Sequence, residues 1–243
     1  ECALPSSLFS WTHLTDLCLM DCRLYYEYHE RTCGDSLGSL TTLYLKGLTG
    51  STKDLVYFLS KCPSLKTLTM LQYPHAYDAI SNTYRTTIID MFQCLPSIEN
   101  LSISSQYFEY FPFVRVGPQK LPTGHLKYCR TEDMCFRTYE NISMLGLLIT
   151  SSPNLERLVV EIKDYYLGES ESGYFKIEDY LDFWLEHLTE VKIENMSDKT
   201  KAELDFVKLI LARSRTLMKV NIVLYQWAGK DVELQILVLS SSL

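Results

Sequence analysis

The side chains in this 243-residue sequence that could bind a metal or act as nucleophiles are eight cysteines and five histidines. Cys18-x₃-Cys22 and Cys129-x₅-Cys135 have the spacings that come nearest to a zinc-ligand pair. Cys18 and Cys22 fall on a predicted strand and at its end, however, and no second pair has matching spacing. The histidines are scattered, and nothing in their positions favours a Cys–His nucleophile pair. We therefore predict no metal, no cofactor, no catalytic residue and no enzymatic activity.

Two further motifs contain residue types that occur in chemical sites, but not in the arrangement that such sites need. The stretch GLTGSTK at 47–53 contains phosphate-loop residues, but a G-x-x-x-x-G-K-[ST] order is needed for backbone amides and lysine to meet the phosphates. We interpret it as a turn and a helix cap. Glu132 and Asp133 are adjacent, so in a strand they point to opposite faces, and we interpret them as solvated surface residues.

Charge and hydropathy exclude other classes of partner. The formal net charge is −7, and no cluster of Lys and Arg marks a nucleic-acid surface. Apolar runs such as MLGLLI at 144–149 are far shorter than the ~20 residues that cross a bilayer. Several cysteines stand where a small apolar residue would fit, which favours buried, reduced thiols. We therefore expect neither nucleic-acid nor membrane binding, and we expect the protein in the nucleus or cytoplasm.

An internal repeat must position whatever the protein binds. The pattern L-x-x-L-x-L, with conservative exchanges, recurs eight times, and its starts are 25 to 33 residues apart. This period is at or slightly above that of leucine-rich repeats. The core positions of the copies are Leu14, Leu17 and Leu19; Leu40, Leu43 and Leu45; Leu65, Leu68 and Met70; Ile98, Leu101 and Ile103; Leu126, Cys129 and Thr131; Leu155, Leu158 and Val160; Leu188, Val191 and Ile193; Leu217, Val220 and Ile222.

Each copy predicts a short strand, because its last two core positions are two residues apart and point to one side. Helical spacing of apolar residues precedes several strands, at 55–62, 88–95 and 142–149, and in the stripe Leu204, Val207, Ile210 and Leu211. Ser51 or Thr52 can cap the first of these helices. Pro63, Pro96 and Pro153 follow helix patterns and precede strands, so they end the helix.

One such unit cannot bury its apolar side alone, whereas stacked units can. We therefore predict an α/β leucine-rich-repeat solenoid of about eight repeats, with a curved parallel sheet on the concave face and helices on the convex face. The alternative is a doubly wound α/β sheet, which would favour longer and wholly apolar strands.

The chain resembles plant F-box/LRR-repeat proteins of the FBD type. The similar stretches are LPSSLFSWTHLTDLCLMDCRL at 4–24, LTTLYLKGLTGSTKDLVYFLSKCPSLKTLTM at 40–70 and, for the FBD module, HLTEVKIENMSDKTKAELDFVKLILARSRTLMKVNI at 187–222. The positions that match in the FBD-like stretch are Leu188, Val191, Ile193, Glu203, Leu204, Phe206, Val207, Leu211 and Leu217. The resemblance implies a solenoid over 1–186 and FBD-like repeats over 187–243 that continue and cap it.

The resemblance also implies a function, the target-recognition part of an SCF ubiquitin ligase subunit. In that family, an N-terminal F-box docks on the Skp1 adaptor while the repeats hold the target. No F-box precedes Leu4 in this sequence, so we expect a Skp1-type adaptor to bind only through an F-box absent from this chain. The alternative is a leucine-rich scaffold, or a receptor for a small molecule or peptide, unrelated to ubiquitin.

Binding is expected on the inner sheet face and on the loops that follow the strands. Aromatic residues recur in those loops, at 25–33, 73–78, 107–113, 165–175 and 225–229, and Tyr and Trp are common in binding hot spots. The candidate partner-binding residues are Tyr44, Tyr73, Tyr107, Tyr110, Tyr128, Arg130, Arg157, Tyr166 and Lys192. Of these, we expect Tyr73, Tyr107, Tyr110 and Tyr166 to form part of a rim.

Overall fold

The computed structural model describes residues 2–3, 6–24, 36–73, 86–111, 120–136, 138–163, 184–196, 201–224 and 232–237. The chain divides into two compact units, residues 1–125 and 126–243. Both units contain β-strands with α-helices between several of them. The boundary predicted at 186/187 separates sequence modules rather than compact units, and it stays a prediction.

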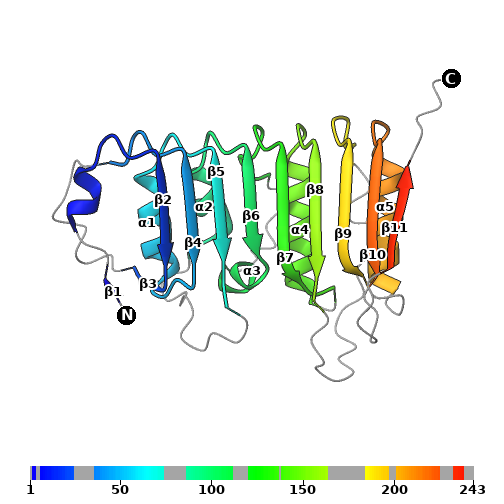
Figure 1. The fold of residues 1–243 in the computed structure, drawn as a ribbon, viewed down its shortest axis with the longest axis horizontal. Coiled ribbons are helices and arrows are strands. Elements are labelled where there is room, and N and C mark those ends of the chain that lie inside the picture. Colours follow the sequence, from blue (N-terminus) through cyan, green and yellow to red (C-terminus); the bar gives the residue numbers. More distant parts are fainter. Residues whose placement is uncertain are drawn as a thin grey trace. The chain divides into compact units, whose positions relative to one another are not determined.

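The first unit is built around four parallel strands in the order β2, β4, β5, β6 (Figure 1). Its elements are β1 (Cys2–Ala3), the 3-10 helix η1 (Ser6–Ser10), β2 (Asp16–Met20), β3 (Cys22–Arg23), β4 (Thr42–Lys46), α1 (Thr52–Ser60), β5 (Thr67–Leu71), α2 (Ile88–Gln93), β6 (Asn100–Ser104) and α3 (Gln106–Tyr110). β1 and β3 form a separate parallel pair that the repeat pattern did not predict.

The second unit continues the same scheme. Its elements are β7 (Tyr128–Met134), α4 (Tyr139–Ser151), β8 (Arg157–Ile162), β9 (Glu190–Met196), α5 (Lys201–Arg213), β10 (Lys219–Leu224) and β11 (Val232–Leu237). β7, β8, β9 and β10 are parallel neighbours in that order. β11 pairs with β10 in antiparallel orientation, which is an addition that the repeat pattern did not predict.

All eight predicted repeat strands are present, and equivalent repeat positions pair across them. Leu43 pairs with Leu68, Leu68 with Leu101, and Leu158 with Val191. The core leucines of the inner strands of the first unit, such as Leu43 and Leu45, are fully buried, whereas Leu14 and Leu17 of the first repeat are half-buried. Burying each such side chain contributes about 1.5–3 kcal/mol. The strands and the stacking of the repeats confirm the leucine-rich-repeat fold.

In each unit the longer helices lie behind the strands in the view of Figure 1 and pack on one face of the sheet. Leu55, Phe58 and Leu59 of α1 are buried, as their helical spacing predicts. Ser51 is the N-cap of α1, and its hydroxyl and the Asp54 carboxylate form a reciprocal capping box. The exchange satisfies amides at the helix start that would otherwise lack an acceptor.

The stripe of buried residues predicted for α5 is rotated about the helix axis relative to the face that the structure buries. The buried residues are Glu203, Phe206, Leu209 and Ile210, whereas Leu204 is 43% and Leu211 42% exposed. Apolar residues occupy two adjoining faces of this helix, so its spacing alone fits either face. On the face that is buried, Phe206 packs against Phe136, and the centroids of the two rings lie 5.2 Å apart.

A left-handed residue recurs two positions after the last core residue of four repeats. Asp21, Gly47, Asp133 and Asn195 have φ angles of 52°, 63°, 58° and 59°. Glycine, and to a lesser extent Asp and Asn, adopts this conformation at low cost. Around Asp133 the register of β7 with β8 shifts, so the corner also forms a bulge that redirects the chain.

Candidate functional site

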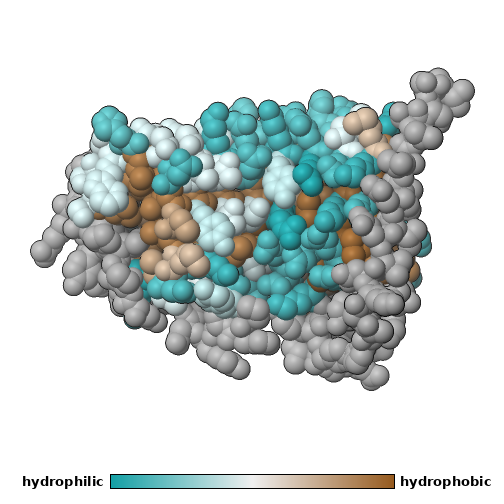
Figure 2. All heavy atoms as spheres, viewed as in Figure 1, coloured by the Kyte–Doolittle hydropathy of each residue, from teal (hydrophilic) through white to brown (hydrophobic). Residues whose placement is uncertain are grey.

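Opposite the helices, each unit presents an open face formed by the outward side chains of its strands. In the first unit the open face consists of Asp16, Cys18, Met20, Thr42, Tyr44, Lys46, Thr67, Thr69, Leu71, Asn100 and Ser102, and the next outward position, Ser104, is buried. In the second unit it consists of Tyr128, Arg130, Glu132, Arg157, Val159, Glu161, Glu190, Lys192, Glu194, Lys219, Asn221 and Val223. Figure 2 shows pale and brown residues over the strands of the first unit, and more teal over β7 to β9.

On the second unit, the residues nearest the strand starts form a row of alternating charge. The Arg157 guanidinium lies 5.6 Å from the ring centroid of Tyr128 on β7. On the other side, Arg157 Nε lies 3.2 Å from Glu190 Oε2 on β9, and Glu190 Oε1 lies 3.0 Å from Lys219 Nζ on β10. Parallel register places these side chains directly opposite one another, so each charge lies beside an opposite charge or an aromatic face.

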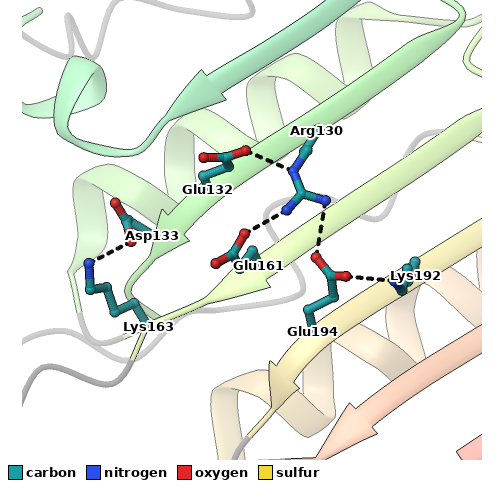
Figure 3. A network of polar contacts seen from close by, with 7 residues as sticks. All are labelled: Arg130, Glu132, Asp133, Glu161, Lys163, Lys192 and Glu194. Carbon is teal, nitrogen blue, oxygen red and sulfur yellow. Dashed lines mark hydrogen bonds and ion pairs between the residues drawn. The ribbon is translucent and has the colours of Figure 1, made fainter. Parts of the chain in front are cut away.

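Arg130 on β7 is the centre of a second network, shown in Figure 3. Its Nε donates to Glu132 Oε1 at 2.9 Å and its Nη2 to Glu161 Oε2 at 2.6 Å. Its Nη1 lies 3.0 Å from Glu194 Oε2 on β9. One guanidinium therefore bridges carboxylates from three neighbouring strands, as its fork of donors allows.

The pKa shifts follow from this crowding. Burial raises the pKa of Glu161, and its neighbours Glu132 and Glu194 add to that effect, although the Arg130 charge opposes it. Burial also acts on Glu194, but the hydrogen bond from Lys192 and the charge of Arg130 outweigh it and lower the pKa. The same carboxylates raise the pKa of Arg130 against its own desolvation, so it is a permanent cation.

A further ion pair lies at the left-handed corner of β7. Lys163, one residue after β8, places Nζ 2.8 Å from Asp133 Oδ1. The corner turns Asp133 away from the direction that a regular strand would give it. Our interpretation of Glu132 and Asp133 as solvated residues missed their partners. Asp133 pairs with Lys163, 30 residues later in the chain, whereas Glu132 pairs with Arg130, two residues earlier on the same strand.

Formal charges on the open face of the second unit balance. Arg130, Arg157, Lys192 and Lys219 stand against four glutamates, Glu132, Glu161, Glu190 and Glu194. Under this layer, Val159 and Asn221 are buried at 1% and 7% exposure. A balanced pattern of fixed charges suits a protein surface with its own pattern and does not attract a polyanion.

The open face of the first unit is nearly uncharged, and a small cluster lies at its lower edge in Figure 1, where the strands end. Tyr73 donates a 3.3 Å hydrogen bond to Asp21 Oδ2, and Lys46 Nζ lies 5.1 Å from the centroid of the Tyr73 ring. The bond to Asp21 raises the pKa of Tyr73. Gly47 lies against the ring, where a Cβ atom would come within 2.4 Å of Cε2. The absence of a side chain at Gly47 therefore leaves room for the Tyr73 ring.

The structure places the predicted site residues in three different environments. The strand residues Tyr44, Tyr128, Arg130, Arg157 and Lys192 lie on the open faces, and Tyr73 is 38% exposed at the edge. Tyr107 is fully buried, which places it in the core rather than on the predicted rim. Its neighbour Tyr110 is half-buried.

Tyr107 is in the core because residues 106–110 form α3 instead of a loop. This short helix turns Tyr107 and Phe108 inward after β6, and the Tyr107 ring lies edge-on to Tyr110 at 5.8 Å. Tyr166 and the aromatic segments at 25–33, 165–175 and 225–229 lie outside the described residues, as does 73–78 apart from Tyr73.

Within the described part of the chain, no group of three His, Cys, Asp or Glu side chains is arranged to hold a metal. The six cysteines whose side chains the structure describes, Cys18, Cys22, Cys62, Cys94, Cys129 and Cys135, are reduced thiols rather than disulfides. Burial raises the pKa of Cys62 and of Cys129 to about 12, so these two are poor nucleophiles at neutral pH. No described helix has the length and apolar character needed to span a membrane.

Comparisons with known proteins agree with the repeat architecture. Residues 1–106 match the family model described as "FBD-associated F-box protein At5g56370, LRR repeats". The F-box/FBD/LRR-repeat protein At1g13570 of Arabidopsis thaliana is 27% identical over 194 residues, which cover 77% of this chain and 45% of that protein. The chain thus spans about half the length of this curated relative.

The solved structure of the leucine-rich repeat-containing protein LegL7 from Legionella pneumophila also aligns. It is 13% identical, with coverage of 90% of this chain and 85% of that one, at a TM-score of 0.27. So low a score adds no weight to the fold, which is established by the strands themselves. The resemblance to plant F-box/FBD/LRR-repeat proteins is confirmed by the family model and the Arabidopsis protein.

Proposed function

We propose that this chain is the target-recognition part of an F-box-type subunit of an SCF ubiquitin ligase, and that it binds a target protein through its open faces. The observation that carries the proposal is the open face itself, two rows of fixed charge on β7 to β10 in a chain similar to F-box/FBD/LRR-repeat proteins. The proposed role is recognition, with no chemical step on this chain.

The charge rows support a protein target over a small ligand. Arg130 is held by three carboxylates and Arg157 lies between Tyr128 and Glu190, so both guanidiniums are already oriented before a partner arrives. Ordering side chains in advance lowers the entropy lost on binding. Alternating charge across four strands would fix the register of a partner and exclude proteins with the wrong pattern.

The open face of the first unit is a second and less polar candidate surface for a target. Tyr44 is half-buried, Met20 is 49% exposed and Leu71 is half-buried, and threonines separate them. Aromatic and methionine side chains are enriched at the centres of protein interfaces. We expect this face to contact an uncharged patch and the open face of the second unit to contact a pattern of alternating charge.

A Skp1-type adaptor would bind through an F-box and not through these repeats. The reduced thiols of these six cysteines are consistent with a reducing compartment, and we propose the nucleus or cytoplasm. Recognition and recruitment would then be separate: the repeats select the protein that is to be ubiquitinated, and the F-box brings the ligase to it.

Two measurements test the proposal. First, the intact protein is purified from plant cells with the proteasome blocked, and we expect a Skp1-type adaptor and the target to purify with it. Second, a photo-crosslinking amino acid replaces Thr69 or Lys192 on the open faces, or Lys208 on the exposed side of α5 as the control. We expect crosslinks to one target from Thr69 and Lys192 but not from Lys208.

The two measurements test separate parts of the proposal. Absence of a Skp1-type adaptor from the intact protein would remove the ubiquitin-ligase part of the proposal and leave a binding scaffold. Crosslinks from Lys208 but from neither open-face position would remove the assignment of the binding surface.

A further inference from the structure

A tryptophan and two arginines meet at the corners that precede β9 and β10. Trp184 and Arg213 each stand four residues before the first core leucine of their repeats, Leu188 and Leu217. Equivalent positions of adjacent repeats lie side by side in a solenoid. Arg215 takes the place that proline takes at the earlier corners, for example at Pro63.

The backbone holds this arrangement in place. Leu185 N donates to Arg213 O at 2.9 Å, just as Leu37 N donates to Lys61 O at 2.8 Å in the first unit. Thr216 Oγ1 donates to Leu188 O at 3.0 Å, which ties the two corners together a second time. The side chains of this cluster therefore extend from a fixed backbone.

Both arginines stack on the indole. The guanidinium carbon lies 4.2 Å from the Trp184 ring centroid for Arg215 and 5.2 Å for Arg213. Trp184 is 44% exposed, so the three side chains form a surface cluster, which we call the Arg–Trp–Arg cluster. Stacking on tryptophan orients a guanidinium by its face and leaves the donors at its edge available.

These donors have no carboxylate partner in the part of the chain that the structure describes. Arg130 and Arg157 pair with glutamates across strands, whereas Arg213 and Arg215 form no ion pair there. Glu186 lies two residues after Trp184 and pairs with neither arginine. In a chain with a net charge of −7, two oriented and unpaired guanidiniums on one indole are a local excess of positive charge.

We propose that the Arg–Trp–Arg cluster binds an acidic segment, rich in Asp or Glu, of a partner protein. Carboxylates accept two parallel hydrogen bonds from a guanidinium, and two guanidiniums fixed on one ring can engage successive acidic side chains. Since the open face of the second unit is charge-balanced, this cluster is a second contact, and it does not depend on the ubiquitin-ligase proposal.

The test is a fluorescence anisotropy titration of the whole chain with a labelled hexaglutamate peptide and, as the uncharged comparison, a hexaglutamine peptide. The variant R213Q/R215Q removes both guanidiniums, and K201Q/K208Q removes the same charge from exposed positions on α5. We expect hexaglutamate alone to bind, about tenfold more weakly in R213Q/R215Q and within about twofold of wild type in K201Q/K208Q. W184L, which keeps both charges but removes the stacking platform, is expected to weaken binding as well.

Equal weakening in the two double variants would overturn the proposal, because general charge would explain it. Undetectable binding of hexaglutamate by the wild-type chain, or equal binding of hexaglutamine, would also overturn it. Tighter binding of a phosphoserine peptide of the same net charge would overturn the assignment to carboxylates. Urea unfolding of each variant shows whether it is folded, and we expect midpoints close to wild type because the substituted side chains are exposed or, for Arg213, half-buried.

Discussion

Arg130 donates a 2.6 Å hydrogen bond to Glu161 on the neighbouring strand, yet the pKa of Glu161 is raised. Burial and the nearby carboxylates disfavour the charge on Glu161 more than Arg130 favours it. Glu194, bound to the same guanidinium, also has Lys192 at 2.6 Å, and its pKa is lowered. Two glutamates in one network thus have opposite effects on folding.

This difference predicts opposite outcomes for two matched substitutions. Glutamine resembles the protonated carboxyl, so Glu194→Gln should lower the free energy of unfolding at pH 7 by about 1 kcal/mol, whereas Glu161→Gln should leave it unchanged or raise it slightly. Urea unfolding at pH 7 measures both. Equal destabilisation by the two variants would contradict the assignment of their pKa shifts.

The pH range in which each glutamate affects the free energy of unfolding follows from the direction of its pKa shift. The folded-state pKa of Glu194 is depressed, so its stabilisation is present above the unfolded pKa and is lost as the pH falls through the folded value. The folded-state pKa of Glu161 is raised, so its unfavourable contribution is absent below the unfolded pKa, grows as the pH rises above that value and is complete above the folded pKa. We therefore expect the stability difference of the Glu161 variant to vanish below the unfolded-state pKa of about 4.3, and that of the Glu194 variant to persist to lower pH, until its depressed folded-state pKa is passed.

Gly47 is the residue at which a single methyl group should disturb the edge of the first unit. Its φ is +63°, and an added Cβ would lie 2.4 Å from Tyr73 Cε2 and 2.5 Å from Asp21 Oδ1. Gly47→Ala should therefore cost about 1–3 kcal/mol and displace the Tyr73 ring. Gly124→Ala is the control, since nothing lies within 4 Å of a Cβ at that position. Similar loss of stability in both variants, by thermal unfolding, would refute the role assigned to Gly47.

The repeat pattern predicted the strands, their parallel register and the outward residues, because a fixed period determines which side chains become neighbours. It therefore placed Arg130, Glu161 and Glu194 on one face. Their ion pairs were not predicted, since contact depends on rotamers and on the bulge at Asp133. The 33 residues from Glu161 to Glu194 equal the step between their repeats, whereas the 31 residues from Arg130 to Glu161 are two more than the 29-residue step, so this pair is diagonal to the register.

Structural features that do not follow the repeat period were not predicted, and each has its own physical reason. The direction of β11 depends on the connection that leads to it, and the repeat pattern carries no information about that connection. On α5 the alternation of apolar residues fits two faces, and the partner Phe136 lies 70 residues earlier in the sequence. Tyr107 was expected on a rim because aromatic residues after a strand suit both a binding loop and a short helix that closes the core.

The buried position of Tyr107 predicts how that residue responds to substitution. Its hydroxyl has no hydrogen-bond partner among the residues that the structure describes, and burial raises its pKa. Tyr107→Phe should leave stability unchanged or raise it by up to about 1 kcal/mol, because it removes an unsatisfied polar group. Tyr107→Ala should lower stability by about 3–5 kcal/mol through the cavity it creates. A large loss in Tyr107→Phe would mean that the hydroxyl has a partner after all.

Thiol accessibility gives a prediction that needs no substitution. Cys18 lies exposed on β2, whereas Cys62 and Cys129 are buried with pKa values raised to about 12. At pH 8 we expect iodoacetamide to modify Cys18 in the folded protein and to reach Cys62 and Cys129 only after unfolding in urea, as peptide mass spectrometry can follow. Because Cys129 takes a core position of the fifth repeat, its modification in the folded state would mean that this repeat is not packed as the structure has it.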